Sequence, residues 1–173
     1  MKIEIWSDFA CPFCYIGKTK FEQALNQFEH KNEVEVTFKA YQLNPYAPKE
    51  MKDNAAEAFA AGHGMSAQDA KQKFKMFEQN AKMVGLTYNY DIIQMTNTFD
   101  AHRLAKYANQ FGLEPKITNV LMKAYFTDGK NLSDFDTLEL IAEEVGLDKK
   151  EARQILDENK FADQVKAEMT EAR

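Results

Sequence analysis

The stretch Ser7–Gly17, SDFACPFCYIG, constrains this chain most, because it holds both of its cysteines, Cys11 and Cys14. The alternating apolar run before it, residues 2–6, predicts a strand, and the apolar spacing after it predicts a helix. Pro12 suits the first turn of that helix, where its missing N–H is not needed. The cysteine pair is therefore expected where a strand leads into a helix.

This position predicts different roles for the two thiols. The first turn of a helix has unpaired N–H groups and a partial positive charge of roughly half an elementary charge. Such a field eases loss of the proton from Cys11, and the thiolate is the nucleophile. Cys14 lies one turn further on the same face, within reach of Cys11. We expect thiol–disulfide exchange through a mixed disulfide on Cys11, which Cys14 resolves.

A metal site and a purely structural disulfide explain the pair less well. A zinc site needs about four ligands, and the three histidines, His30, His63 and His102, are scattered along the chain. A disulfide that closes so short a loop stabilises a fold little. We therefore expect no metal and a redox role.

Composition indicates a folded protein without a nucleic-acid or membrane partner. The 173 residues fit one compact domain, or a small domain with an insertion, and 45% are hydrophobic. A net charge of −5 disfavours nucleic acid and anionic membranes. Met1 and Lys2 run straight into the first predicted strand without a signal-peptide pattern, and no stretch approaches about 20 apolar residues. We expect a cytoplasmic protein, where a disulfide is usually transient and catalytic.

The order of predicted elements gives an α/β protein with a large helical insertion. Residues 34–40 alternate and predict a second strand, which a right-handed crossover places parallel to the first. Asn44–Pro48 interrupts regular structure. We therefore expect an N-terminal βαβ part over 1–48, an inserted and entirely helical domain over 49–146, and a returning helix over 147–173.

Within the helical part, polar residues mark helix starts and aromatic residues mark the core. The candidate helix caps are Ser66 with Asp69, Thr98, Asp136, and Asp148 with Glu151. The aromatic positions at helical spacing are Phe74, Phe77, Phe99, Tyr107, Phe111, Tyr125 and Phe126. Most of these are expected in the core, and some of them, with Met76, Met83 and Met95, are candidates to line an apolar groove over Cys11.

Four further residues are candidates for shaping or tuning the site. His102 or Arg103 would reach the first helix and tune the thiolate; alternatively, Arg103 pairs with an acid and His102 packs between helices. Trp6 and Phe9 flank the cysteines. They are expected to pack the strand and the loop, and Phe9 is also a candidate to shape the substrate entrance.

Three stretches resemble one family. SDFACPFCYIGK, YQLNP at 41–45 and NTFDAHRLAKYA at 97–108 are similar to segments of the DsbA-like thioredoxin superfamily, in particular its FrnE-like cytosolic branch. The resemblance covers essentially all 173 residues and implies a thioredoxin-like fold. Family members continue into two antiparallel strands, preceded by a cis-proline loop that faces the cysteines. No proline here follows position 115, so these strands are expected to be absent from this chain, leaving a two-stranded sheet with an edge open to pairing.

The resemblance implies a dithiol–disulfide oxidoreductase or isomerase that acts on protein or peptide thiols and disulfides. Cys11 and Cys14 would be catalytic, and Pro12 and Phe13 would set the helix geometry and the redox potential. No metal or organic cofactor is implied, and glutathione or a thioredoxin-type system would recycle the pair. The direction of electron flow, the client proteins and the oligomeric state stay open.

Two alternatives keep the fold and change the activity. Kappa-class glutathione transferases and hydroxychromene-carboxylate isomerases resemble this chain but carry serine at the position of Cys11. A non-catalytic adaptor that presents a regulator for proteolysis is the other alternative. Activity that survives Cys14→Ser would favour the first, and partner binding unchanged in Cys11→Ser would favour the second.

Overall fold

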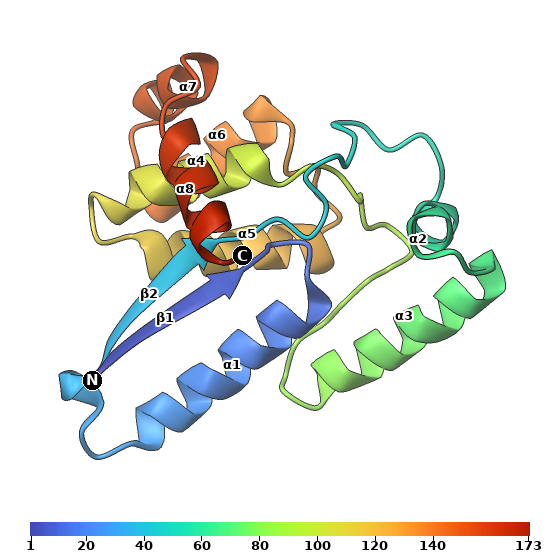
Figure 1. The fold of residues 1–173 in the computed structure, drawn as a ribbon, viewed down its shortest axis with the longest axis horizontal. Helices are drawn as coiled ribbons and strands as arrows, with labels where there is room; N and C mark the ends of the chain where they lie inside the picture. The colour runs from blue at the N-terminus through green and yellow to red at the C-terminus, as the bar shows by residue number, and fades with distance from the viewer.

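The computed structural model describes residues 1–173 and begins with a βαβ unit (Figure 1). Strand β1 (Lys2–Ser7) leads into helix α1 (Pro12–Gln27), and a short 3₁₀ turn, η1 (Lys31–Glu33), precedes β2 (Glu35–Ala40). The two strands pair in parallel, from Lys2 opposite Glu35 to Ser7 opposite Ala40. The predicted parallel crossover is therefore confirmed.

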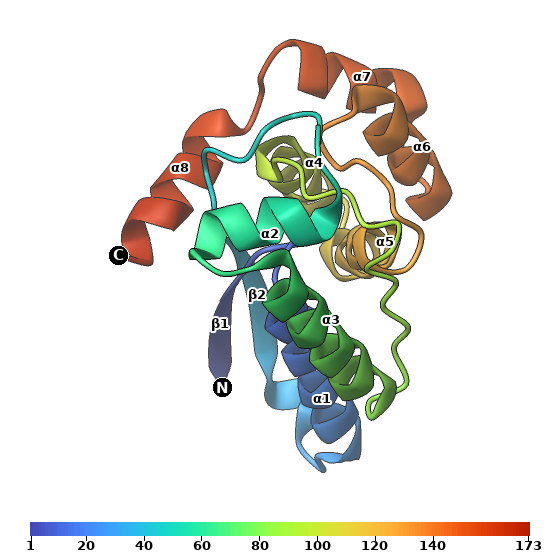
Figure 2. The same cartoon turned by 90° about the vertical axis from the view of Figure 1, so that its right-hand side faces the viewer.

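Seven helices make up most of the remaining chain. They are α2 (Ala55–His63), α3 (Ala67–Lys82), α4 (Phe99–Asn109), α5 (Glu114–Phe126), α6 (Phe135–Val145), α7 (Lys149–Asp157) and α8 (Ala162–Glu171). Helix α2 packs on α3, and α3 packs on α1, whereas α4 to α7 pack on one another (Figure 2). None of the helices is both long and apolar enough to cross a bilayer. The predicted α/β class with a helical insertion is confirmed.

The expectation of an entirely helical segment over 49–146 is wrong between α3 and α4. Residues 83–98 form an irregular segment that runs back across the molecule. Long-range hydrogen bonds hold it: the Asn89 N–H donates to the Phe126 carbonyl at 2.7 Å, and the Tyr88 hydroxyl donates to the Pro12 carbonyl at 2.7 Å. Such bonds to distant residues replace the local ladder of a helix, which the apolar spacing alone does not reveal.

Two of the predicted helix caps are confirmed and two are wrong. The side chains of Ser66 and Asp148 accept hydrogen bonds from backbone N–H groups at the starts of α3 and α7. Helix α6 is capped by Asp134 rather than Asp136, two residues earlier than expected. Thr98 precedes α4 without capping it, because its hydroxyl is bound to Asp8. The Asn97 side chain accepts from the Phe99 N–H instead, at 2.9 Å.

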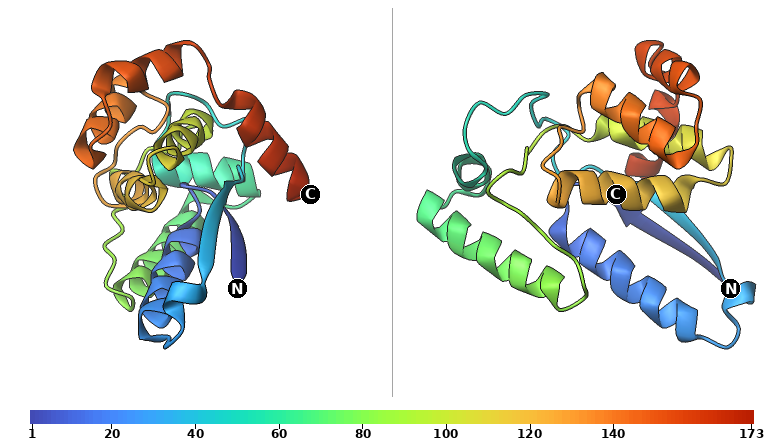
Figure 3. Two further views of the ribbon diagram at one scale, coloured as in Figure 1. Left: turned by 90° about the vertical axis from the view of Figure 1, so that its left-hand side faces the viewer. Right: turned by 180° about the vertical axis from the view of Figure 1, so that it is seen from behind.

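Helix α8 packs against β2 (Figure 3), and polar contacts hold it to the sheet. The indole N–H of Trp6 donates to the Glu168 carbonyl at 2.9 Å, and the Ala40 N–H donates to the Glu168 carboxylate at 2.6 Å. The ammonium of Lys106 on α4 lies 3.0 Å from the same carboxylate. Trp6 is therefore part of the α8 contact, on the side of the sheet where Lys39 also covers its ring.

Arg103 on α4 organises the turn between α7 and α8. It is 1% exposed and forms an ion pair with Asp100 at 2.6 Å. Its remaining N–H groups donate to the carbonyls of Ile155, Leu156 and Lys160 at 2.7 to 3.0 Å. These carbonyls lie where the hydrogen-bond ladder of α7 ends. The guanidinium gives them donors in addition to the backbone N–H groups of Asn159 and Lys160, which reach Leu156 and Ile155.

Replacing Arg103 with methionine should strongly destabilise the fold. The change removes the buried guanidinium from the Asp100 carboxylate, which keeps only the exposed Lys49 at 3.3 Å, and it takes one donor from each of three carbonyls. Breaking such a buried pair costs about 3–5 kcal/mol. Urea unfolding followed by circular dichroism measures this loss. The exposed Arg153, which bridges acidic side chains at the surface, is the matched control, and Arg153→Met should leave the midpoint nearly unchanged. Equal effects of the two substitutions would contradict the assignment.

Candidate active site

The two cysteines lie at the start of α1, in the geometry that the sequence predicts. Cys11 is the N-cap residue with extended backbone angles, Pro12 occupies the first helical turn, and the Cys14 N–H donates to the Cys11 carbonyl at 3.1 Å. A turn closed by the Cys11 N–H and the Asp8 carbonyl, at 3.2 Å, joins β1 to this helix. Both side chains are free thiols, and Cys11 is 9% exposed.

The thiols share a hydrogen bond that separates their pKa values. The S–H of Cys11 donates to the sulfur of Cys14 and lowers the pKa of Cys14 to about 6; burial opposes this, and the Asp8 N–H and Ser7 hydroxyl support it. The same hydrogen bond, together with burial, raises the pKa of Cys11. The pair thus has one lowered and one raised pKa, and the expected low pKa on Cys11 stays a prediction. The Phe13 and Cys14 N–H groups lower the pKa of Cys11, as expected at a helix start, but the S–H bond to Cys14 and burial outweigh them.

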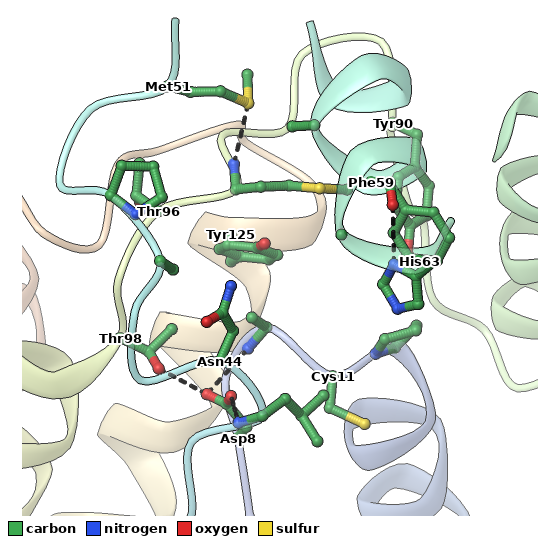
Figure 4. A pocket seen from close by; sticks show the side chains of 18 of the residues that line it. Asp8, Cys11, Asn44, Met51, Phe59, His63, Tyr90, Thr96, Thr98 and Tyr125 are labelled. Atoms are coloured by element: carbon green, nitrogen blue, oxygen red, sulfur yellow. Dashed lines mark hydrogen bonds between the residues drawn. The ribbon is translucent and has the colours of Figure 1, made fainter. Parts of the chain in front are cut away.

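A pocket of about 870 Å³ opens beside Cys11 (Figure 4). Its wall includes Cys11, Pro12 and Phe13 but not Cys14. Five other segments contribute apolar side chains to it, which are Leu43, Ala47, Pro48, Met51, Ala58, Phe59, Phe77, Tyr90, Met95 and Tyr125. Phe13 is 56% exposed and meets the ring of Phe77 edge-on, with centroids 5.3 Å apart. A large apolar surface thus leads to the sulfur of Cys11.

Asp8 joins the segments that surround the cysteines. Its carboxylate is 2% exposed and accepts from the Thr98 hydroxyl at 2.7 Å and from the Leu43 N–H at 2.8 Å. Nε2 of His102 lies 3.4 Å from the same carboxylate. Burial alone would raise the pKa of Asp8, but the His102 contact and these two donors outweigh it and lower the pKa. The side chain is therefore held as a carboxylate.

The remaining candidate residues lie at different distances from the two cysteines. His102 contacts Asp8 and stacks on Phe9, with centroids 4.5 Å apart, so it reaches the cysteines through the residues just before them. Arg103 points away, to α7. Phe9 is buried and, like Trp6, lies outside the pocket wall.

Four polar side chains at the site were not predicted from the sequence. Asp8 lies within the recognised cysteine stretch but was given no role, Thr98 was expected only to cap a helix, and Tyr88 donates to the Pro12 carbonyl from the irregular segment. His63, at the end of α2, lines the pocket and stacks on Phe59, with centroids 3.9 Å apart. The sequence signal for Asp8 was its position, because it is a charged residue directly after an apolar strand. The partners are too far apart in the chain for any local pattern to show.

No group of three or more histidine, cysteine or acidic side chains is arranged to hold a metal ion. Pro12 and Phe13, which the family resemblance implies set the helix geometry and the redox potential, lie between the cysteines and line the pocket.

The thiol pair should titrate near pH 6, well below the ordinary thiol value of 9.0. Ultraviolet absorbance of the thiolate measures this midpoint, and Cys14→Ser should abolish the transition. The Asp8 carboxylate raises the pKa of Cys14 by charge repulsion, so Asp8→Asn should move the midpoint to still lower pH. A midpoint that rises in Asp8→Asn would contradict this electrostatic account.

Asp8 should also make the fold sensitive to acid. Its pKa is lowered from 3.8 in the folded protein, so its contribution to stability is present above the unfolded value and is lost as the pH falls through the folded value. Urea midpoints measured between about pH 6 and pH 2 should fall less steeply for Asp8→Asn than for the natural chain. Parallel pH profiles would exclude this role for Asp8.

Comparison with known proteins agrees with this geometry. The sequence matches the DSBA-like thioredoxin domain over residues 2–173. A probable DsbA oxidoreductase from Streptomyces coelicolor is 34% identical, with a TM-score of 0.92 over 99% of this chain and 74% of that one. A 2-hydroxychromene-2-carboxylate isomerase shares the fold, at 16% identity and a TM-score of 0.69, over 99% of this chain and 79% of its own.

One curated relative is the uncharacterized protein YwbO of Bacillus subtilis. It is 25% identical over 165 residues, which cover 93% of this chain and 74% of the relative. The extent of the domain match and the likeness to the Streptomyces structure together show the family. The chain belongs to the DsbA-like thioredoxin family.

Proposed function

We propose that this protein is a dithiol–disulfide oxidoreductase or isomerase of the FrnE-like type, acting on protein or peptide disulfides in the cytoplasm. The observation that carries this proposal is the pair of free thiols one turn apart at the start of α1, with Cys11 opening into the apolar pocket. A thiolate shared by two sulfurs, beside a surface suited to an unfolded chain, supports exchange with protein disulfides.

Cys11 is the attacking residue in this proposal because it lines the pocket and Cys14 does not. The thiol pair has one proton to share once the first is lost, and transfer of that proton to Cys14 exposes a Cys11 thiolate. This thiolate attacks a substrate disulfide, forms a Cys11–substrate bond and releases the other substrate sulfur as a thiolate. Cys14 then gives its proton to the departing substrate sulfur and attacks Cys11, so the Cys11–Cys14 disulfide forms and the Cys11–substrate bond breaks. Two electrons pass to the substrate, whose two sulfurs leave as one thiolate and one thiol.

The reverse sequence oxidises a substrate dithiol and uses the same atoms. The potential of the pair and its recycling partner decide the direction. Glutathione or a thioredoxin-type protein is the proposed partner, and the chemistry needs no metal or organic cofactor. Pro12 and Phe13 would influence the potential, since they set the helix start and the exposure of the two sulfurs.

A redox titration tests the proposal directly. In glutathione buffers, quenched by alkylation and read by intact mass, Cys11 and Cys14 should convert together as a two-electron couple. The midpoint should fall between about −120 and −270 mV, the range of catalytic pairs. Cys14→Ser should accumulate mixed disulfides on Cys11, and Cys11→Ser should show no couple. A pair that stays reduced, or that forms only glutathione adducts, would sink the proposal.

A glutathione-dependent transferase or isomerase is the second candidate, since a 2-hydroxychromene-2-carboxylate isomerase shares the fold. A glutathione-dependent transferase or isomerase needs one position that binds the glutathione thiol, and it does not need two protein sulfurs that form a disulfide. Consumption of glutathione with an aromatic electrophile, retained in Cys14→Ser, would favour it over disulfide exchange.

A further inference from the structure

Two tyrosine hydroxyls face the pocket beside Cys11 and have no role in the proposed mechanism. Tyr90 comes from the irregular segment before α4, Tyr125 comes from the end of α5, and both line the pocket (Figure 4). Their side chains are 6% and 3% exposed, so both residues are more than nine-tenths buried. A buried tyrosine hydroxyl usually finds a hydrogen-bond partner within the protein.

These two hydroxyls lack such a partner. The buried hydroxyls of Tyr88 and Tyr107 each donate a hydrogen bond at 2.7 Å. Burial and nearby charges raise the pKa of Tyr90 and of Tyr125 above 10.0, and no hydrogen bond contributes to either shift. The fully enclosed side-chain polar atom without a partner is the Ser7 hydroxyl, so the two phenol oxygens are open to the pocket. Both are therefore free to bind a group that enters it.

The rings that carry these hydroxyls are held in place. The ring of Tyr90 stacks on Phe74, with centroids 4.1 Å apart, and its backbone N–H donates to the Glu78 carboxylate at 3.2 Å. The ring of Tyr125 meets Phe126 edge-on, with centroids 4.9 Å apart. Because packing fixes both rings before a ligand arrives, little side-chain freedom is lost on binding.

The lining of the pocket indicates which group fits beside the two hydroxyls. The charged side chains of Glu50, Lys52, Asp53 and His63 line it but are exposed, so they lie at its open side. The less exposed lining around the hydroxyls is mostly aromatic and includes Phe59, Phe77 and Met95. Aromatic rings and methionine sulfur both pack well against a further ring. An aromatic ring with a hydrogen-bonding tip therefore matches both the wall and the hydroxyls.

A charged group fits this inner part of the pocket less well. Asp8 is the buried charged residue in the wall, and its carboxylate repels an anion. It already accepts from Thr98 and Leu43 and contacts His102. A cation would thus lose its hydration to reach a carboxylate whose hydrogen-bonding capacity is largely used. An uncharged phenol avoids both costs.

We propose that Tyr90 and Tyr125 select client peptides that carry a tyrosine beside the reacting cysteine, by pairing with the hydroxyl of that tyrosine. The inference rests on the proposed oxidoreductase function and names a class of its clients. A phenol both donates and accepts a hydrogen bond, so one client hydroxyl can serve two phenols. A client phenylalanine would cover the two hydroxyls and leave them without a partner, and a site of this kind rejects such a side chain.

Short peptide disulfides test this selection. Each peptide carries tyrosine, phenylalanine or lysine directly before or directly after a cysteine that is bonded to thionitrobenzoate. The Cys11 thiolate attacks the peptide sulfur, the bond to thionitrobenzoate breaks, and the coloured thionitrobenzoate thiolate is released. Each rate is divided by the rate of the same peptide with free glutathione, which removes differences in intrinsic reactivity. At the position that enters the pocket, tyrosine should react about fivefold faster than phenylalanine, the size of one neutral hydrogen bond.

Matched variants assign the selection to the two hydroxyls. Tyr90→Phe and Tyr125→Phe keep the packed rings and should each lower the preference for tyrosine, and the double variant should abolish it. Tyr107→Phe is the control, since it removes an equally buried hydroxyl that bonds to Glu151 outside the pocket, and it should keep the fivefold preference. Circular dichroism of each variant checks that the fold is retained.

Three results would overturn the selection: equal rates for tyrosine and phenylalanine at both positions, a preference for lysine, or a preference that survives the double substitution. A free phenol is the other source of the same chemical group. If p-cresol slows every peptide while tyrosine gives no advantage, the pocket binds a small phenol and the client class is wrong.

Failure of the oxidoreductase function gives a different result. In that case no peptide releases thionitrobenzoate faster with the natural chain than with Cys11→Ser. The pocket is then tested by calorimetry on Cys11→Ser, with peptides that carry serine in place of cysteine. The tyrosine peptide should bind about fivefold more tightly than the phenylalanine peptide, and equal dissociation constants would refute the role of the two tyrosines.

Discussion

The buried carboxylate of Asp8 is the contact on which the arrangement of the site depends. It lies at the junction of β1 and α1 and accepts hydrogen bonds from the loop after β2, at Leu43, and from the start of α4, at Thr98. The same two segments are joined by Gln42 and Asn97, at 3.0 Å. Burying a charge is costly unless it is paired and hydrogen-bonded, so these segments are held together around the cysteines.

This convergence explains why three separated stretches of the sequence carry the family resemblance. The cysteine stretch supplies Asp8, the stretch at 41–45 supplies Gln42, and the stretch at 97–108 supplies Asn97 and Thr98. Asn97 also donates to the Pro45 carbonyl at 3.0 Å. Each stretch thus provides partners that the other two need. The pocket beside Cys11 lies between elements whose relative positions these contacts fix.

Local sequence patterns predicted the strands and helices, whereas contacts between residues far apart in the chain determine the features that were not predicted. The strand–helix–strand unit, the position of the cysteines and the caps at Ser66 and Asp148 follow from neighbouring residues, and the structure has them. Thr98 has the residue type of a cap, but a carboxylate ninety residues earlier takes its hydroxyl. Residues 83–98 are irregular for a similar reason, since the Asn89 N–H donates to the Phe126 carbonyl on α5 and the Asn97 N–H donates to the Pro48 carbonyl. The pKa order of the cysteines depends on the direction of one S–H bond, which spacing does not encode.

The electrostatics of the site balance stability of the fold against reactivity. The Asp8 carboxylate gathers the segments, yet its charge raises the pKa of the neighbouring Cys14. A cysteine that must ionise beside a buried anion needs donors that do not depend on that anion. The backbone N–H of Asp8 and the hydroxyl of Ser7 meet this need, because both are held by β1 and its turn rather than by the substrate. The fold can therefore keep a stabilising charge next to its reactive pair, since the same strand end also supplies donors to the thiolate.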